Sequence, residues 1–209
     1  MNKLVSDIND LKRTVIKKTV DTRLKEFEEL GKKNNDDWFS ELCFCILTAN
    51  SKARTALAIQ KELGPKGFCN LNREDISKCI QRNKHRFHNN KSRFIIEARQ
   101  FKNIKTILSQ FKDEFMMREW LVKNVKGLGY KEASHFLRNV GFKNVSILDR
   151  HILNLLYENN YITKVPKPLT KKNYFEIEKI FQKLAKEMNM SCAELDLYMW
   201  YMKAGEVLK

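Results

Sequence analysis

Apolar residues recur at helical spacing over most of this chain. Leu4, Ile8, Leu11 and Val15 fall on one stripe, and the run 38–47 is apolar nearly all round, as a central buried helix would be. No long segment alternates apolar and polar residues with a period of two, and the chain has no Asn-Gly hairpin turn. We therefore predict an all-α protein.

Helix-breaking residues stand at the ends of the apolar stretches. A helix over 53–63 is expected to stop at Gly64-Pro65, and further helices are expected over 94–108 and 115–122. The stretch 162–172 contains two prolines and several lysines, so we expect an exposed connection there.

The chain carries a large positive charge. Its 209 residues include 40 Lys plus Arg against 25 Asp plus Glu, which gives a formal net charge of +15. Such a surplus is typical of proteins that bind nucleic acid, although the lysine-rich surface of a thermophile protein would give the same charge. Because the chain has neither a run of 18 apolar residues nor an apolar signal core at its start, we expect no membrane association.

The five cysteines are scattered along the chain, at positions 43, 45, 69, 79 and 192. Their odd number and spacing indicate reduced thiols, and hence a cytoplasmic protein. Only Cys192 lies in the last hundred residues, so the four thiolates of a C-terminal iron–sulfur cluster are lacking. We expect Cys43 and Cys45 to be buried in the core.

The segment 125–151 carries the most informative pattern. It begins VKGLGYK, in which Gly127 and Gly129 permit a tight turn between two helices. The helix after this turn would present free N–H groups and its positive dipole end, a combination that binds phosphate. The Gly-x-Gly pattern alone is weak evidence for a phosphate site at Gly127 and Gly129, and the residues beyond the turn strengthen it.

A lysine and an aspartate come after the turn at a suggestive spacing. Lys131 falls in the first turn of the second helix, where a positive helix end favours the neutral, nucleophilic amine. Asp149 follows an apolar run and precedes Arg150, which predicts a helix N-cap. One helix of about ten residues and a return loop would bring Asp149 back beside Lys131. A lysine nucleophile with a nearby carboxylate is the pair needed to break a glycosidic bond while keeping the sugar attached.

These residues resemble the helix-hairpin-helix and catalytic aspartate of the base-excision DNA glycosylase superfamily. The lysine at position 131 resembles the lysine that marks the bifunctional glycosylase/lyase branch of this superfamily. The chain departs from the superfamily at Lys126, where a proline is common. The chain as a whole resembles the archaeal-type 8-oxoguanine DNA glycosylase/AP lyases. The further segments that carry this likeness are 41–50, 85–87, 132–141 and 194–200.

The resemblance implies a fold of two helical lobes with the active site in the cleft between them. One lobe would comprise 1–30 and 131–209 and contain both termini. The other, 31–130, would be a helical barrel that leads into the helix-hairpin-helix at about 115–140.

The resemblance also implies roles for residues outside the hairpin. Asn50 would enter the duplex as a wedge, Phe87 and Trp200 would stack on the two faces of the flipped base, and Lys209 would help to recognise it. Each has a plainer alternative: Asn50 as a cap, the two aromatic residues as core, and Lys209 as a frayed terminus.

The implied reaction is attack by Lys131 on C1′ with Asp149 stabilising the positive sugar, followed by β-elimination. No cofactor and no metal are expected, and the partner would be double-stranded DNA containing 8-oxoguanine, bound by a monomer in the cytoplasm. Two alternatives are a glycosylase for another damaged base and a non-catalytic helix-hairpin-helix module that binds DNA.

Four other polar residues have less specific interpretations. We expect His85 to belong to a DNA-facing basic strip and His135 to be packed in the interior. His151 could contact phosphate or bond within the start of its helix, and Asp196 could either pair with another helix or contact the base.

Overall fold

The computed structural model describes residues 3–209, which are helical and contain no strand. This confirms the predicted all-α class. In chain order the helices are α1 (Lys3–Leu11), α2 (Val15–Lys32), α3 (Asn35–Thr48), α4 (Ala53–Asn70), α5 (Arg73–Arg82), α6 (His88–Ala98), the 3-10 turn η1 (Arg99–Phe101), α7 (Ile104–Leu108), α8 (Glu114–Asn124), α9 (Tyr130–Asn139), α10 (Arg150–Glu158), α11 (Lys171–Glu187) and α12 (Cys192–Ala204). Among the described residues, no helix has the length and apolar character to cross a membrane.

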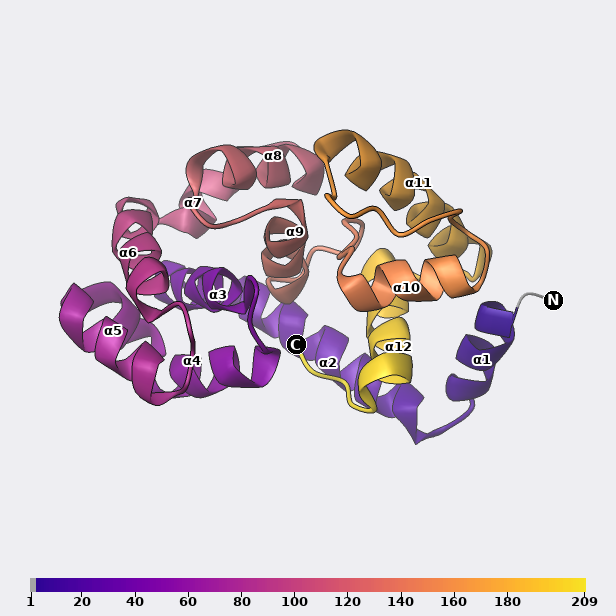
Figure 1. Ribbon diagram of the computed structural model, residues 1–209, viewed down its shortest axis with the longest axis horizontal. Helices are drawn as coiled ribbons and strands as arrows, with labels where there is room; N and C mark the ends of the chain where they lie inside the picture. The colour runs from indigo at the N-terminus through magenta and orange to yellow at the C-terminus, as the bar shows by residue number, and fades with distance from the viewer. Residues whose placement is uncertain (1–2) are drawn as a thin grey trace.

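The buried apolar residues form two separate cores. One is supplied by residues 38–145, which we call the middle lobe, and the other by residues 4–27 and 148–207, which we call the terminal lobe. Figure 1 shows α3 to α9 gathered on one side, α1 and α10 to α12 on the other, and α2 running between the two groups.

The position of α9 bears on where the lobes divide. Its buried residues Ala133, Phe136 and Leu137 belong to the core of the middle lobe. A boundary at residue 130, as expected from the resemblance, would cut α9 away from that core. We propose instead that the second boundary lies between Val145 and Leu148, where one core ends and the other resumes.

Two of the expected helices are interrupted, and in each case a polar side chain marks the break. Thr14 caps α2 by accepting a hydrogen bond from the N–H of Ile16 at 3.2 Å, so Val15 begins a new helix and is 81% exposed. The prediction that Val15 continues the buried stripe of Leu4 is therefore wrong. The expected helix over 94–108 divides into α6, η1 and α7, because Asn35 of α3 accepts from the N–H groups that open α7.

The expected stop at Gly64-Pro65 is present as a kink. Gly64 has φ +58, a conformation that favours glycine, and helical geometry resumes beyond it to the end of α4 at Asn70.

A buried ion pair joins the two lobes through α8 and α11. The two terminal nitrogens of the Arg118 guanidinium donate to the Glu178 carboxylate, at 2.5 and 2.6 Å, and one of them also donates to Ser134 of α9 at 3.1 Å. Glu178 in turn accepts from the N–H of Ser146 at 3.0 Å, and the Tyr174 hydroxyl donates to the Ser146 carbonyl. The connection between α9 and α10 is therefore held by α11, which Arg118 in turn ties to the middle lobe.

We expect Glu178→Gln to lower the free energy of unfolding by about 3 kcal/mol, because it leaves the Arg118 charge buried without a counter-charge. Chemical denaturation measures this loss. Glu176→Gln, an exposed position on the same helix, is the matched control and should change stability by less than about 0.5 kcal/mol. Equal losses from the two variants would contradict a structural role for the buried pair.

Candidate active site and DNA-binding hairpin

The turn between α8 and α9 is shaped by two glycines in different ways. Gly127 has φ +90, and a Cβ there would lie 2.7 Å from the ring of Phe94. Gly129 is extended and forms the N-cap of α9, where its N–H donates to the Glu132 carboxylate at 3.2 Å. Val125 and Leu128 are buried and anchor the turn in the middle lobe. The result is a helix-hairpin-helix whose second helix begins at Tyr130.

Lys131 lies in the first turn of α9, as the sequence predicts. Its side chain is 27% exposed, and its Nζ lies 3.0 Å from Glu132 Oε1. The other oxygen of Glu132 accepts from Gly129, so one carboxylate holds both the hairpin turn and the lysine. The amine is thus accessible and held close to the N-terminus of the helix.

Asp149 is the N-cap of α10, which confirms the predicted cap. Its Oδ1 accepts from the N–H of Ile152 at 2.9 Å. This bond fixes the carboxylate at the start of α10, directly after the connection that Glu178 holds in place.

Asp196 lies within electrostatic reach of both candidate catalytic side chains. It is buried on α12 and paired with Arg138 of α9, so of its two open interpretations the structure shows the helix-to-helix pair. The pKa of Asp196 is raised to about 6, chiefly by burial; the charge of Asp149 adds to the rise, and the charges of Arg138 and Lys131 oppose it. Lys131 and Asp149 thus stand at the starts of two helices that both contact α12, α9 through the Arg138–Asp196 pair and α10 by packing.

The two candidate base-stacking rings come from different lobes. Trp200 lies on α12 of the terminal lobe, with its ring edge-on to His151 at 5.1 Å between centroids. Its indole N–H is buried and has no hydrogen-bond partner among the described residues. Phe87 precedes α6 in the middle lobe, with the Arg86 guanidinium 4.5 Å from its ring centre. No contact joins the two rings.

His85 does not lie on a DNA-facing strip, and that expectation is wrong. Its side chain is buried, with Nε2 3.0 Å from the Leu47 carbonyl and Nδ1 accepting from the Phe87 N–H at 3.2 Å. Burial lowers the pKa of His85. The histidine therefore ties the position of Phe87 to the end of α3.

The turn after α3 carries Asn50 at an exposed position. Asn50 has φ +59, a left-handed conformation that asparagine tolerates better than most residues. The last carbonyls of α3 are held by His85 and by Lys91, whose Nζ donates to Ile46 at 2.6 Å. Burial lowers the pKa of Lys91 to about 8. Two buried side chains thus support the turn that presents Asn50.

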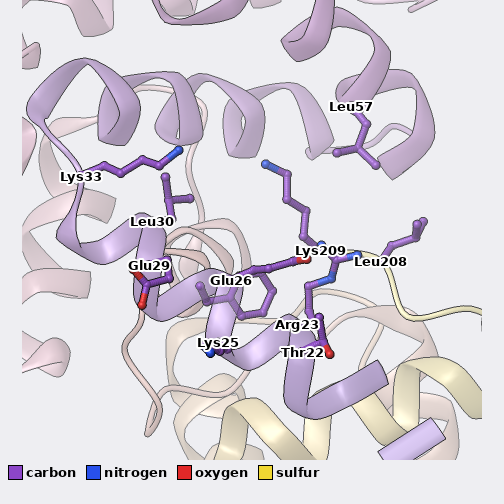
Figure 2. A pocket seen from close by; sticks show the side chains of 11 residues that line it. Thr22, Arg23, Lys25, Glu26, Glu29, Leu30, Lys33, Leu57, Leu208 and Lys209 are labelled. Carbon is purple, nitrogen blue, oxygen red and sulfur yellow. Dashed lines mark hydrogen bonds and ion pairs between the residues drawn. The ribbon is translucent and has the colours of Figure 1, made fainter. Parts of the chain in front are cut away.

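Lys209 is held in the middle lobe by its side chain. Its Nζ donates to Glu41 at 2.6 Å and to Gln60 at 2.7 Å, and it lies 4.5 Å from the centre of the Phe44 ring. Lys209 also enters a groove of about 660 Å³ between α2 and α4, with Arg23 on one side and Leu57 on the other (Figure 2). Lys209 is therefore bound by other side chains and is not a frayed terminus.

Glu41 and Gln60 were not among the candidate site residues. Glu41 is a carboxylate within the otherwise apolar run 38–47. Because a buried charge requires a partner, its position in this run indicates that Glu41 is paired with another polar side chain. No comparable signal marks Gln60. Which residue pairs with Glu41 depends on where the end of the chain lies.

His135 is packed in the interior, as expected. Its ring is edge-on to Phe44 at 5.6 Å, and its Nε2 is buried without a hydrogen-bond partner among the described residues. Burial lowers the pKa of His135 well below its usual value, and the nearby charges of Arg138, Lys131 and Lys209 lower it further. The side chain is therefore neutral at pH 7.

The family model for 8-oxoguanine DNA glycosylase of the helix-hairpin-helix type matches residues 20–190. This match includes the hairpin, Lys131 and Asp149. The chain belongs to the 8-oxoguanine DNA glycosylase family.

Relatives in this family match over nearly the whole chain. An 8-oxoguanine DNA glycosylase/AP lyase of Methanocaldococcus jannaschii is 50% identical over 99% of both chains, and one of Korarchaeum cryptofilum is 44% identical over 99% of this chain and 98% of the relative. The crystal structure of the M. jannaschii protein with DNA containing 8-oxoguanine covers 99% of each chain at a TM-score of 0.96 and 50% identity. The glycosylase of Thermotoga maritima has a TM-score of 0.93 at 38% identity, over 99% of each chain.

In this family member we expect Gly127→Ala to lower the free energy of unfolding by about 2 kcal/mol, because φ is +90 and the methyl group would meet the Phe94 ring. Gly129→Ala is the matched control. Its backbone is extended, and its methyl group would meet only the movable Glu132 carboxylate, at 3.2 Å. Chemical denaturation should show less than half the loss for Gly129→Ala, and the reverse order would contradict the assigned roles.

Proposed function

We propose that this protein excises 8-oxoguanine from double-stranded DNA and then nicks the strand at the abasic site. The observation that carries the proposal is the placement of Lys131 at the start of α9 and of Asp149 at the N-cap of α10, with α9 tied to the terminal lobe by the Arg138–Asp196 pair. Relatives at 50 and 44% identity that bear the name 8-oxoguanine DNA glycosylase/AP lyase support it.

Lys131 is the nucleophile of the proposed reaction. Its neutral amine attacks C1′ of the damaged nucleotide as the bond to the base breaks, and the base leaves with the bonding electrons and takes up a proton. The sugar ring then opens to an imine between Lys131 and C1′. The imine acidifies the proton on C2′, and loss of that proton expels the 3′ phosphate by β-elimination.

Asp149 stabilises the positive charge that develops on the sugar as the base leaves. Its carboxylate is held by the N–H of Ile152, so it does not have to reorganise during the reaction. No step of this scheme requires a cofactor or a metal ion.

The base reaches Lys131 only after it has left the duplex, which costs a few kcal/mol in stacking and pairing. We assign Asn50, on its exposed turn, to the gap that the base leaves. Phe87 and Trp200, which lie on different lobes, take the two faces of the flipped base, and Lys209 contributes to its recognition. Because the two rings come from separate lobes, the flipped base would lie at the boundary between the lobes.

The hairpin binds the DNA backbone. The N-terminus of α9, which follows the N-cap Gly129, presents N–H groups to a phosphate, and Gly127 lets the chain turn closely enough to reach it. The net charge of +15 adds a strong, salt-dependent attraction that is independent of sequence.

We also propose that the protein acts as a monomer on chromosomal DNA in the cytoplasm. All five cysteines are free and buried, which is typical of a reducing compartment. Both lobes of the proposed site come from one chain, so no second copy is needed to complete it.

Trapping with borohydride tests the nucleophile. The wild-type protein should form a covalent adduct with duplex DNA containing 8-oxoguanine, because borohydride reduces the imine, and Lys131→Gln should form none. Lys126→Gln, an exposed lysine of the same hairpin, is the control and should still give the adduct.

An adduct that persists in Lys131→Gln would assign the attack to another amine. Binding of the duplex without any adduct in the wild type would point to a non-catalytic DNA-binding module. A panel of other damaged bases in the same duplex identifies a glycosylase of different specificity.

Asp149→Asn tests the carboxylate apart from its structural role, because asparagine caps a helix about as well as aspartate. We expect the thermal midpoint to stay nearly unchanged while the single-turnover rate of base excision falls by about 100-fold. A rate within about twofold of the wild type would remove Asp149 from the reaction.

A further inference from the structure

The last residues of the chain cross from one lobe to the other. After α12, Gly205 turns the chain with φ +71, and its N–H donates to the Tyr201 carbonyl at 2.8 Å. Val207 is then buried in the core of the terminal lobe, whereas Lys209 Nζ binds Glu41 and Gln60 in the middle lobe. We call residues 206–209 the C-terminal tail.

Two arginines hold the tail along this path. The Arg54 guanidinium binds the Glu206 carboxylate through two nitrogens, with Nε to Oε1 at 3.1 Å and Nη2 to Oε2 at 2.6 Å. Arg23 of α2 donates to the Val207 carbonyl at 3.4 Å. Arg54 stands in the first turn of α4, and Gln60 stands further along the same helix. Both ends of the tail therefore attach to α4.

Paired geometry of this kind distinguishes the Arg54–Glu206 contact from an ordinary surface ion pair. A single exposed ion pair adds little to the stability of a protein. Two parallel N–H to carboxylate bonds, in contrast, also fix the orientation of the two side chains relative to each other. A four-residue tail without this contact would keep only the buried Val207, the Arg23 bond to the Val207 carbonyl and the bonds of Lys209 itself. The side chain of Lys209 would then have to order the tail as well as contact a base.

We propose, on the basis of the base-recognition role proposed above for Lys209, that the Arg54–Glu206 pair is a latch that positions this lysine. Arg54 and Glu206 would act on the base only through Lys209, so we assign them as positioning residues. The latch matters for base excision, in which the base is recognised, and not for cleavage of an abasic site, which has no base to recognise.

The test compares two reactions under single-turnover conditions with saturating enzyme. Arg54→Ala and Glu206→Gln should each slow 8-oxoguanine excision by about fivefold and leave cleavage of a preformed abasic site unchanged. The two substitutions change the net charge in opposite directions, so a general electrostatic effect on DNA binding would not slow both. Exchanging the charges, in Arg54→Glu with Glu206→Arg, should restore most of the rate.

Glu62→Gln is the matched control. Glu62 lies on the same helix as Arg54 and makes an exposed ion pair with Arg82 of α5, away from the tail. Hydrogen exchange supplies a readout that does not depend on catalysis: the amides of 207–209 should exchange faster in Arg54→Ala than in the wild type, and not in Glu62→Gln.

Replacement of Lys209 separates the two ways in which the latch and the proposed function can fail. If Lys209→Ala slows excision but Arg54→Ala and Glu206→Gln do not, the latch is overturned and the role of Lys209 stands. If Lys209→Ala leaves excision unchanged, the recognition role of the lysine is wrong, and the proposed positioning is overturned with it.

Discussion

A chain of buried charges and amides at the boundary between the lobes is the constraint on which the rest of the structure depends. Lys209 binds Glu41, Glu41 accepts from Asn139, Asn139 accepts from Arg138, and Arg138 binds Asp196. Two positive and two negative charges balance within it. Buried charges are tolerated only when each is paired, so no member can move without leaving another uncompensated. The lobes are thereby held in one relative position.

The proposed active site takes its geometry from the same contacts. Helix α9 carries Lys131 at its start and Arg138 near its buried end, so pairing Arg138 with Asp196 also fixes the helix that bears the lysine. Trp200 lies one helical turn beyond Asp196 on α12. The buried ion pair between α8 and α11 independently fixes the connection that ends at Asp149. The proposed site therefore draws on groups from three helices, and these helices belong to both lobes.

Features that depend on neighbouring residues were predictable from the sequence. The cap by Asp149, the place of Lys131 in the first turn of α9 and the break at Gly64 all follow from local backbone chemistry, and the structure contains them. One failure is local, because the Thr14 cap begins a new helix at Val15, and two others involve distant partners. The expected helix over 94–108 is divided by the side chain of Asn35, and His85 is drawn inward by the Leu47 carbonyl. Neither partner can be identified from spacing along the chain.

The sequence by itself therefore determined the helical class, the hairpin and the identity of the two residues proposed to react, since helical periodicity, glycine turns and N-caps operate over a few residues. Only the tertiary structure decided which charges pair across the lobes, where the C-terminal tail lies and that Lys209 meets Glu41. Those pairings join positions as much as 168 residues apart. They are set by the need to compensate every buried charge, which acts through space and leaves no fixed interval in the sequence.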